Sequence, residues 1–112
     1  MRDDRERLRD ILEAIERIER YTAKGREEFE RDELIQTWVV HHIQIIGEAA
    51  RKLSEEVHSE HDQVPWPAII AMRNILVHDY FSVDIDEVWS TVERNLPDLK
   101  ANISSIMDDM EA

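Results

Sequence analysis

Apolar residues recur every three or four positions through most of this 112-residue chain, and that spacing leaves few folds open to it. Between residues 4 and 22 the apolar set is Leu8, Ile11, Leu12, Ile15 and Ile18, with Arg and Glu at most positions between them. A broader apolar face follows at residues 28–53, and similar stripes run through 67–79 and 84–110. Glycine, a poor helix former, occurs only twice. The sequence therefore predicts an all-α protein.

We predict one domain, residues 1–112, folded as an up-and-down bundle of four long helices and one short helix. The apolar stripes mark the long helices, and Ser54 can cap the short one, which should end near His61. Pro97 is expected to kink or split the last long helix, because proline clashes with the preceding turn. Gly47 predicts a close helix crossing, since glycine there costs about 1 kcal/mol relative to alanine.

The composition limits the compartment and the chemistry. Cysteine is absent, so the chain has no disulfide and no thiolate metal site. The first twenty residues are dense in charge, and no apolar run approaches the length of a membrane span. We expect a cytoplasmic protein without a membrane segment.

The formal net charge of −12 opposes indiscriminate binding to nucleic acid, because attraction to phosphate supplies the sequence-independent part of that affinity. The distribution of the charge matters as well. Nine of the fourteen basic residues lie at or before Arg31, interleaved with acids. A local positive region around Arg73 would still allow selective and modest binding to RNA.

The segment from Arg73 to Tyr80 gathers a guanidinium, an amide, an imidazole and a phenol at the end of an apolar helical stretch, and Arg73 is the only Lys or Arg between Lys52 and Arg94. Asn74 and His78 are four apart and share a helix face. Arg73 and His78 point about 140° apart on a regular helix.

Arg73 and His78 therefore converge only if the helix ends near His78, if the arginine bends round, or if a second chain supplies the partner. The spacing alone is also compatible with a structural role, in which Arg73 forms an ion pair and His78 meets the last helix carbonyls.

The pattern Arg-x4-His-x-Tyr, with Asn74 directly after the arginine, resembles the signature of HEPN-domain ribonucleases. The resemblance is to the HepT-type toxins that are paired with a minimal nucleotidyltransferase (MNT) antitoxin. It extends in order and spacing over about residues 8–107, through Ile45-Ile46-Gly47-Glu48-Ala49-Ala50, Val64-Pro65-Trp66, Met72-Arg73-Asn74, Val83-Asp84, Val88-Trp89 and Leu96-Pro97.

This resemblance implies a HEPN-like helical fold and a homodimeric endoribonuclease that cleaves RNA without metal or cofactor. His78 would be the acid and base, Arg73 the phosphate clamp, and Asn74 the group that orients His78 or the phosphate. Tyr80 matches the tyrosine that the nucleotidyltransferase adenylylates. Glu48 is either a partner of Arg73 or a solvated residue at the rim. The alternative function is a non-catalytic HEPN-like module that binds a nucleotide or a nucleotidyltransferase partner.

Overall fold

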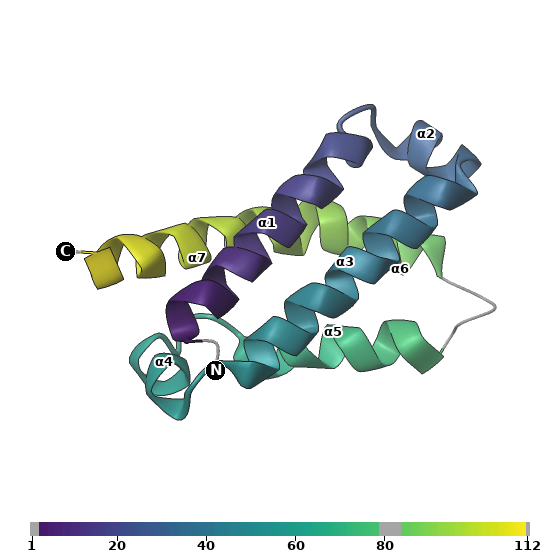
Figure 1. The fold of residues 1–112 in the computed structure, drawn as a ribbon. Coiled ribbons are helices and arrows are strands. Elements are labelled where there is room, and N and C mark those ends of the chain that lie inside the picture. Colours follow the sequence, from purple (N-terminus) through teal and green to yellow (C-terminus); the bar gives the residue numbers. More distant parts are fainter. Residues whose placement is uncertain (1–2, 79–83, 112) are drawn as a thin grey trace.

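The structure is a computed structural model that describes residues 3–78 and 84–111, and for residues 74–78 it describes the backbone alone. Every regular element within these ranges is a helix, which confirms the all-α prediction (Figure 1). The elements are α1 (Asp4–Thr22), α2 (Arg26–Arg31), α3 (Glu33–Lys52), α4 (Glu55–Glu60), α5 (Trp66–His78), α6 (Ile85–Ser90), the π-helix η1 (Thr91–Asn95) and α7 (Leu96–Glu111).

The second long helix differs from the prediction, because residues 28–53 do not form one helix. The chain is extended at Asp32, which separates α2 from α3. The Asp32 carboxylate accepts a hydrogen bond of 2.9 Å from the amide of Leu34 and so caps α3. The side-chain amide of Gln36 donates to the Phe29 carbonyl at the end of α2, at 3.0 Å. Both helix ends at the break are therefore satisfied, and α2 is a short helix that the prediction did not include.

Pro97 does not split the last helix. Helices α6, η1 and α7 follow one another without a gap, and the Leu96 amide donates to the Thr91 carbonyl, five residues back. A proline in a regular α-helix clashes with the carbonyl four residues earlier, here that of Glu93. The wider π turn displaces this carbonyl and lets the helix continue through the proline.

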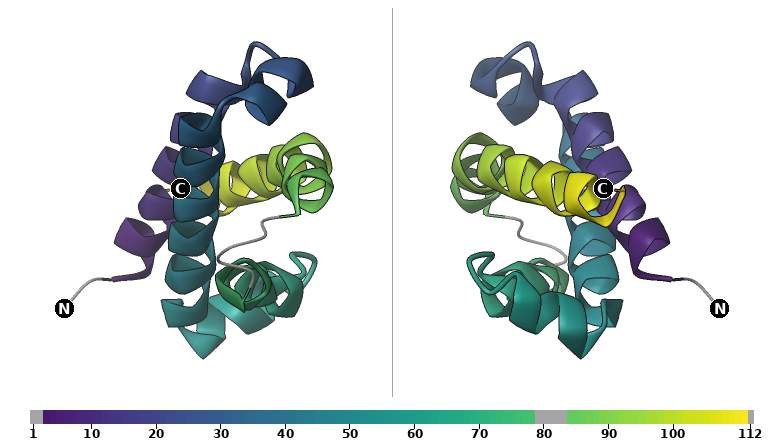
Figure 2. Two further views of the ribbon diagram at one scale, coloured as in Figure 1. Left: turned by 90° about the vertical axis from the view of Figure 1, so that its right-hand side faces the viewer. Right: turned by 90° about the vertical axis from the view of Figure 1, so that its left-hand side faces the viewer.

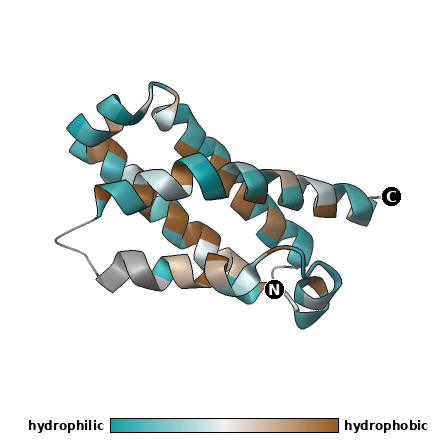
Figure 3. Ribbon diagram, turned by 180° about the vertical axis from the view of Figure 1, so that it is seen from behind, coloured by the Kyte–Doolittle hydropathy of each residue, from teal (hydrophilic) through white to brown (hydrophobic). Residues whose placement is uncertain are grey.

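Helices α1 and α3 pack side by side, α7 crosses α1, and α5 packs under the C-terminal half of α3 (Figures 1 and 2). The apolar sides of the helices face one another, as the hydropathy colouring shows (Figure 3). Fully buried large side chains among the described residues include Leu8, Ile11, Ile15, Ile18, Phe29, Val39, Ile43, Ile46, Val64, Leu99, Ile103 and Ile106.

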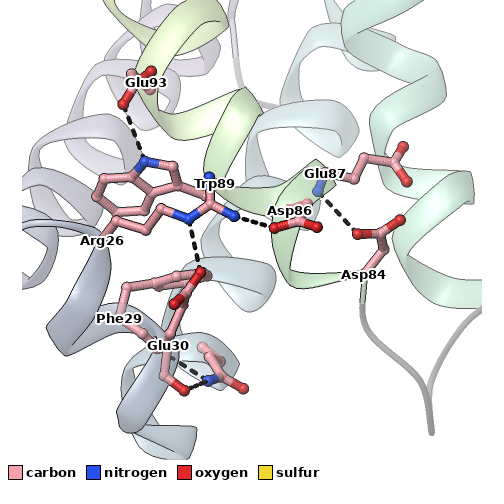
Figure 4. A network of polar contacts seen from close by, with 9 residues as sticks. Arg26, Phe29, Glu30, Asp84, Asp86, Glu87, Trp89 and Glu93 are labelled. Atoms are coloured by element: carbon pink, nitrogen blue, oxygen red, sulfur yellow. Dashed lines mark hydrogen bonds and ion pairs between the residues drawn. The ribbon is translucent and has the colours of Figure 1, made fainter.

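Helix α2 anchors the start of α6, the element that follows residues 79–83 (Figure 4). Arg26 pairs with Glu30 on its own helix, at 2.7 Å, and with Asp86 on α6. Beside this pair, the rings of Phe29 and Trp89 lie 5.3 Å apart between centroids. The contacts fix the position at which the chain continues after the predicted functional segment.

Gly47 marks a close crossing of α3 and α5, as the sequence predicted. A Cβ added to Gly47 would lie 2.8 Å from the Cβ of Arg73 and 3.4 Å from the Ile69 carbonyl oxygen. A contact of 2.8 Å between two carbon atoms bonded directly to backbone is too short to be relieved by a rotamer change. The absence of a side chain at Gly47 therefore allows α5 to lie directly on α3.

The change Gly47→Ala tests this crossing. Alanine should gain about 1 kcal/mol of helix propensity, but the clash with Arg73 should cost about 1–3 kcal/mol. We expect a net loss of about 1 kcal/mol in the free energy of unfolding, measured by urea denaturation. An increase in stability would show that α3 and α5 can separate without penalty.

Candidate functional site

The predicted functional segment begins in the second half of α5. Arg73 lies over Gly47 on α3, and its side chain is described. The backbones of Asn74 and His78 belong to α5, but their side chains lie outside the described residues. Tyr80 also lies outside the described residues. The roles assigned to these three residues therefore remain predictions.

Arg73 is held by Glu48, which is the residue next to Gly47 on α3. The Arg73 Nη1 and Glu48 Oε2 atoms are 3.1 Å apart. Of the two expected positions for Glu48, as a partner of Arg73 or as a solvated residue at the rim, the structure shows the partner of Arg73. The Arg73 side chain is 41% exposed. Exposed ion pairs of this kind contribute about 0.2–1 kcal/mol, so Arg73 can form a further contact with an anion at little cost.

Two more basic residues share the Glu48 carboxylate. Arg51 Nη2 lies 2.7 Å from Glu48 Oε1, and Lys52 Nζ lies 3.6 Å from the same oxygen. We call Glu48, Arg51, Lys52 and Arg73 the cation cluster. Its three positive charges and one negative charge leave a formal excess of two positive charges.

The cation cluster keeps Glu48 ionised. The hydrogen bond from Arg51 lowers the pKa of Glu48 most, and the charges of Arg51, Arg73 and Lys52 lower it further, against the opposing effect of desolvation. The carboxylate is therefore negative at neutral pH and orders the three cations around it.

Arg51 and Lys52 were not among the predicted site residues. They lie three and four residues after Glu48 on α3, the spacing at which helix side chains become neighbours. That spacing was the signal in the sequence that could have identified them. Their position in the last turn of α3 also suits the negative end of the helix dipole.

His42, a histidine with a lowered pKa, does not contact the cation cluster in the part of the chain that the structure describes. Its side chain is buried, and its Nδ1 donates a hydrogen bond of 2.7 Å to the Trp38 carbonyl. Burial is the main cause of its lowered pKa, and the positive charges of His41 and Arg17 lower it further. His42 is thus a neutral core residue.

Among the side chains of residues 3–73 and 84–111, no group of three or more His, Asp or Glu is placed to hold a metal ion. No helix within the described ranges is long and apolar enough to cross a membrane.

The fold and the cation cluster define a class: an all-α bundle that places an arginine from an Arg-x4-His segment beside further basic residues. The chain belongs to the HepT-like ribonuclease family, whose model, "Ribonuclease HepT-like", matches residues 11–106. The match covers α5 and most of the helices packed around it.

Individual relatives agree with the family. The chain is 38% identical over 105 residues to a protein of Methanocaldococcus jannaschii named "Gamma-glutamylcyclotransferase and putative RNase". That match covers 93% of this chain and 47% of the relative, so the chain spans about half the length of that protein.

Two relatives of similar length were also found. A protein of Thermococcus cleftensis named "Probable ribonuclease HepT" is 36% identical over 106 residues, covering 94% of this chain and 96% of the relative. A protein of Caldanaerobacter subterraneus subsp. tengcongensis named "Putative RNase" is 34% identical over 108 residues, with 96% of each chain covered. No solved structure matches this chain significantly.

The change Glu48→Gln tests the electrostatics of the cation cluster. Folding lowers the pKa of Glu48 from its ordinary value of 4.5. The charged carboxylate therefore stabilises the folded state fully when the pH is above 4.5, and this contribution is lost as the pH falls below 4.5. At pH 7 we expect the variant to lose about 0.5–1 kcal/mol of unfolding free energy. At pH 3 the difference from the parent should be smaller.

Urea unfolding at both pH values provides the measurement, and Glu56→Gln, at an exposed position on α4, is the matched control. If both variants show the same pH dependence, the cation cluster does not hold Glu48 in its charged form.

Proposed function

We propose that this protein is a metal-independent endoribonuclease toxin of a toxin-antitoxin pair, acting on RNA in the cytoplasm. The observation that carries the proposal is the cation cluster beside the Arg-x4-His segment in a member of a ribonuclease family. The proposal concerns four steps: binding of phosphate, proton transfer, assembly of the site, and its inhibition.

Binding of phosphate is the first step. RNA binding needs a local positive potential, and the formal net charge of −12 works against it elsewhere on the chain. The excess of two positive charges in the cation cluster provides such a potential around Arg73. Arg73 has an exposed guanidinium that can donate to phosphoryl oxygens while Glu48 keeps it oriented.

Proton transfer is the second step. In RNA cleavage by transesterification, a 2′-hydroxyl loses its proton and its oxygen attacks the adjacent phosphorus, while the 5′-oxygen leaves and takes up a proton. The products are a 2′,3′-cyclic phosphate and a 5′-hydroxyl. Histidine titrates near neutral pH, so His78 is assigned the proton transfer. Arg73 would stabilise the charge that grows on the phosphoryl oxygens, and Asn74 would orient His78 or the phosphate.

Assembly of the site is the third step. Residues five apart on a helix point about 140° away from each other, so Arg73 and His78 of one chain are poorly placed to share a phosphate. We therefore propose a homodimer in which Arg73 of one chain and His78 of the other line one cleft.

Inhibition is the fourth step. A minimal nucleotidyltransferase partner would act on Tyr80: the phenolic oxygen attacks the α-phosphorus of ATP, pyrophosphate leaves, and the phenolic proton is released. The attached AMP would bring a phosphate charge close to Arg73 and compete with RNA for it.

The acidity of the chain favours a second candidate function. With a formal net charge of −12, a non-catalytic HEPN-like module would use Arg73 as a phosphate contact for a nucleotide or for a nucleotidyltransferase partner. Such a module would bind without cleaving RNA, so the two functions differ in a measurable way.

The change His78→Ala tests the chemistry. The variant should lose RNA cleavage by at least about a hundredfold, the lower end of what general acid and base catalysis supplies. The parent should cleave in the presence of a chelator and leave a 2′,3′-cyclic phosphate, detected by mass spectrometry of the fragments. His61→Ala is the matched control and should retain full activity. Undiminished cleavage by His78→Ala would remove the assignment.

The same variant tests whether the cleft needs two chains. Neither Arg73→Ala nor His78→Ala should cleave alone, but a mixed dimer keeps one intact site if each site takes Arg73 and His78 from different chains. Mixing the two variants under conditions that exchange subunits should restore up to about a quarter of the parent activity per chain. No recovery on mixing would place both residues of a site in one chain.

The change Tyr80→Phe tests the regulation. Incubation of the parent with the cognate nucleotidyltransferase and ATP should add AMP to Tyr80, seen in the intact mass, and should abolish cleavage. Tyr80→Phe should cleave RNA nearly as well as the parent, because the phenol is not assigned a proton transfer, and should escape inhibition. If Tyr80→Phe is inactive, the phenol is part of the catalytic set. If it is active and still inhibited, the partner acts in another way.

A further inference from the structure

A groove separate from the cation cluster lies between α5 and the η1–α7 part of the last helix. Its volume is about 630 Å³, within the roughly 300–1,000 Å³ of typical ligand sites. Its sides combine apolar groups with the side-chain amides of Gln63, Asn95 and Asn102 and with one charge of each sign, from Arg94 and Asp98. The apolar lining residues are Pro65, Ile69, Leu99 and Ala101. We call it the amide groove.

The side-chain amides of Asn95 on η1 and Asn102 on α7 reach the amide groove because they share one face of the last helix. Asn95, Leu99 and Asn102 follow one another at intervals of four and three residues, so their side chains form a row. Leu99 is buried, whereas Asn95 is exposed and Asn102 half-buried. The row thus consists of one buried apolar side chain between two polar side chains.

The π turn contributes directly to this arrangement. Asn95 is the last residue of η1, where the helix is closed by the hydrogen bond from the Leu96 amide to the Thr91 carbonyl. Arg94, the neighbouring residue of η1, also lines the amide groove. Single π turns within α-helices occur frequently at functional sites.

The chemistry of the amide groove matches a nucleobase. A base is a flat ring with apolar faces and with hydrogen-bond donors and acceptors along its edges. Pro65 and Ala101, which are exposed, offer apolar contact for a face, with the buried Ile69 and Leu99 at the base of the groove. Asparagine and glutamine amides are the side chains that pair with base edges through two hydrogen bonds. Arg94 can meet a phosphate or stack on a ring.

We propose that the amide groove binds one nucleobase of the RNA substrate and sets the base preference of cleavage. This inference rests on the proposed ribonuclease function. Ile69 is one helical turn before Arg73 on α5, about 6 Å along the axis, and both residues lie against Gly47. A base in the amide groove and a phosphate at Arg73 would therefore belong to the same or to neighbouring nucleotides.

Binding can be measured without catalysis, in the full-length His78→Ala variant. The probes are the four nucleoside 5′-monophosphates, with ribose 5-phosphate as the probe that lacks a base. We expect at least one nucleotide to shift the side-chain amide signals of Asn95 and Asn102 in a saturable manner in NMR spectra, and ribose 5-phosphate to leave them unchanged. Adding Asn95→Ala and Asn102→Ala should weaken binding of that nucleotide about three- to tenfold.

Cleavage provides the second measurement, in chains that keep His78. The cleavage sites of the parent on a mixed-sequence RNA should show a base preference, which the Asn95→Ala/Asn102→Ala variant should lose while its thermal unfolding is unchanged. Gln44→Ala, which removes an amide on α3 away from the groove, should keep the preference and the affinity.

The outcomes separate this inference from the proposed function. If the parent cleaves RNA and the double variant keeps both the preference and the nucleotide affinity, the amide groove is not a base site. If nucleotides shift only the signals of the cation cluster, the inference also fails. If nucleotides bind in the amide groove but the parent does not cleave RNA, the groove assignment is supported and the proposed ribonuclease function is wrong.

Discussion

The contact between Gly47 and Arg73 is the constraint on which the functional half of this structure depends. Without a Cβ at Gly47, α5 lies close enough to α3 for Arg73 to reach Glu48, the next residue along α3. One backbone position therefore sets the distance between two helices and the partner of the main candidate phosphate ligand. A bulkier residue at position 47 would change the distance between α3 and α5 and the Arg73–Glu48 pair together, because Glu48 moves with α3 and Arg73 moves with α5.

The cation cluster shows why net charge is a poor guide to what an acidic protein can bind. Charges separated by more than about 8 Å are largely screened at physiological ionic strength, so a bound phosphate responds mainly to the groups nearest to it. Around Glu48 those groups are three cations from two helices. Under the proposed function, the acids elsewhere on the chain would favour selectivity, because they would weaken binding of RNA wherever it does not reach the cation cluster.

Much of the fold could be predicted from the sequence because helix periodicity is a local property. The stripe of Leu8, Ile11 and Ile15 gave α1 with its observed bounds, and Gly47 indicated the crossing. The break at Asp32 was missed because an apolar stripe does not register a single extended residue whose carboxylate caps the next helix. The π turn was missed for a different reason. Pro97 indicates that the helix cannot stay regular, but the sequence does not say whether it bends, breaks or widens into a π turn. Within the site, the partner of Arg73 could be anticipated, whereas Arg51 and Lys52 became significant only once Glu48 was seen to face α5.

The π turn also has a consequence for how the length of this helix can vary. A turn closed between residues five apart contains one residue more than an α-helical turn. Removing one residue there would restore α-helical geometry and leave the two ends of the helix nearly where they are, but it would also restore the clash of Pro97 with the carbonyl four residues before it. The same deletion in a regular part of α7 would rotate everything after it by about 100° and turn the buried row of Leu99, Ile103 and Ile106 away from the core. Residues 91–95 are thus the part of the last helix where a length change is compatible with the packing of α7 on α1.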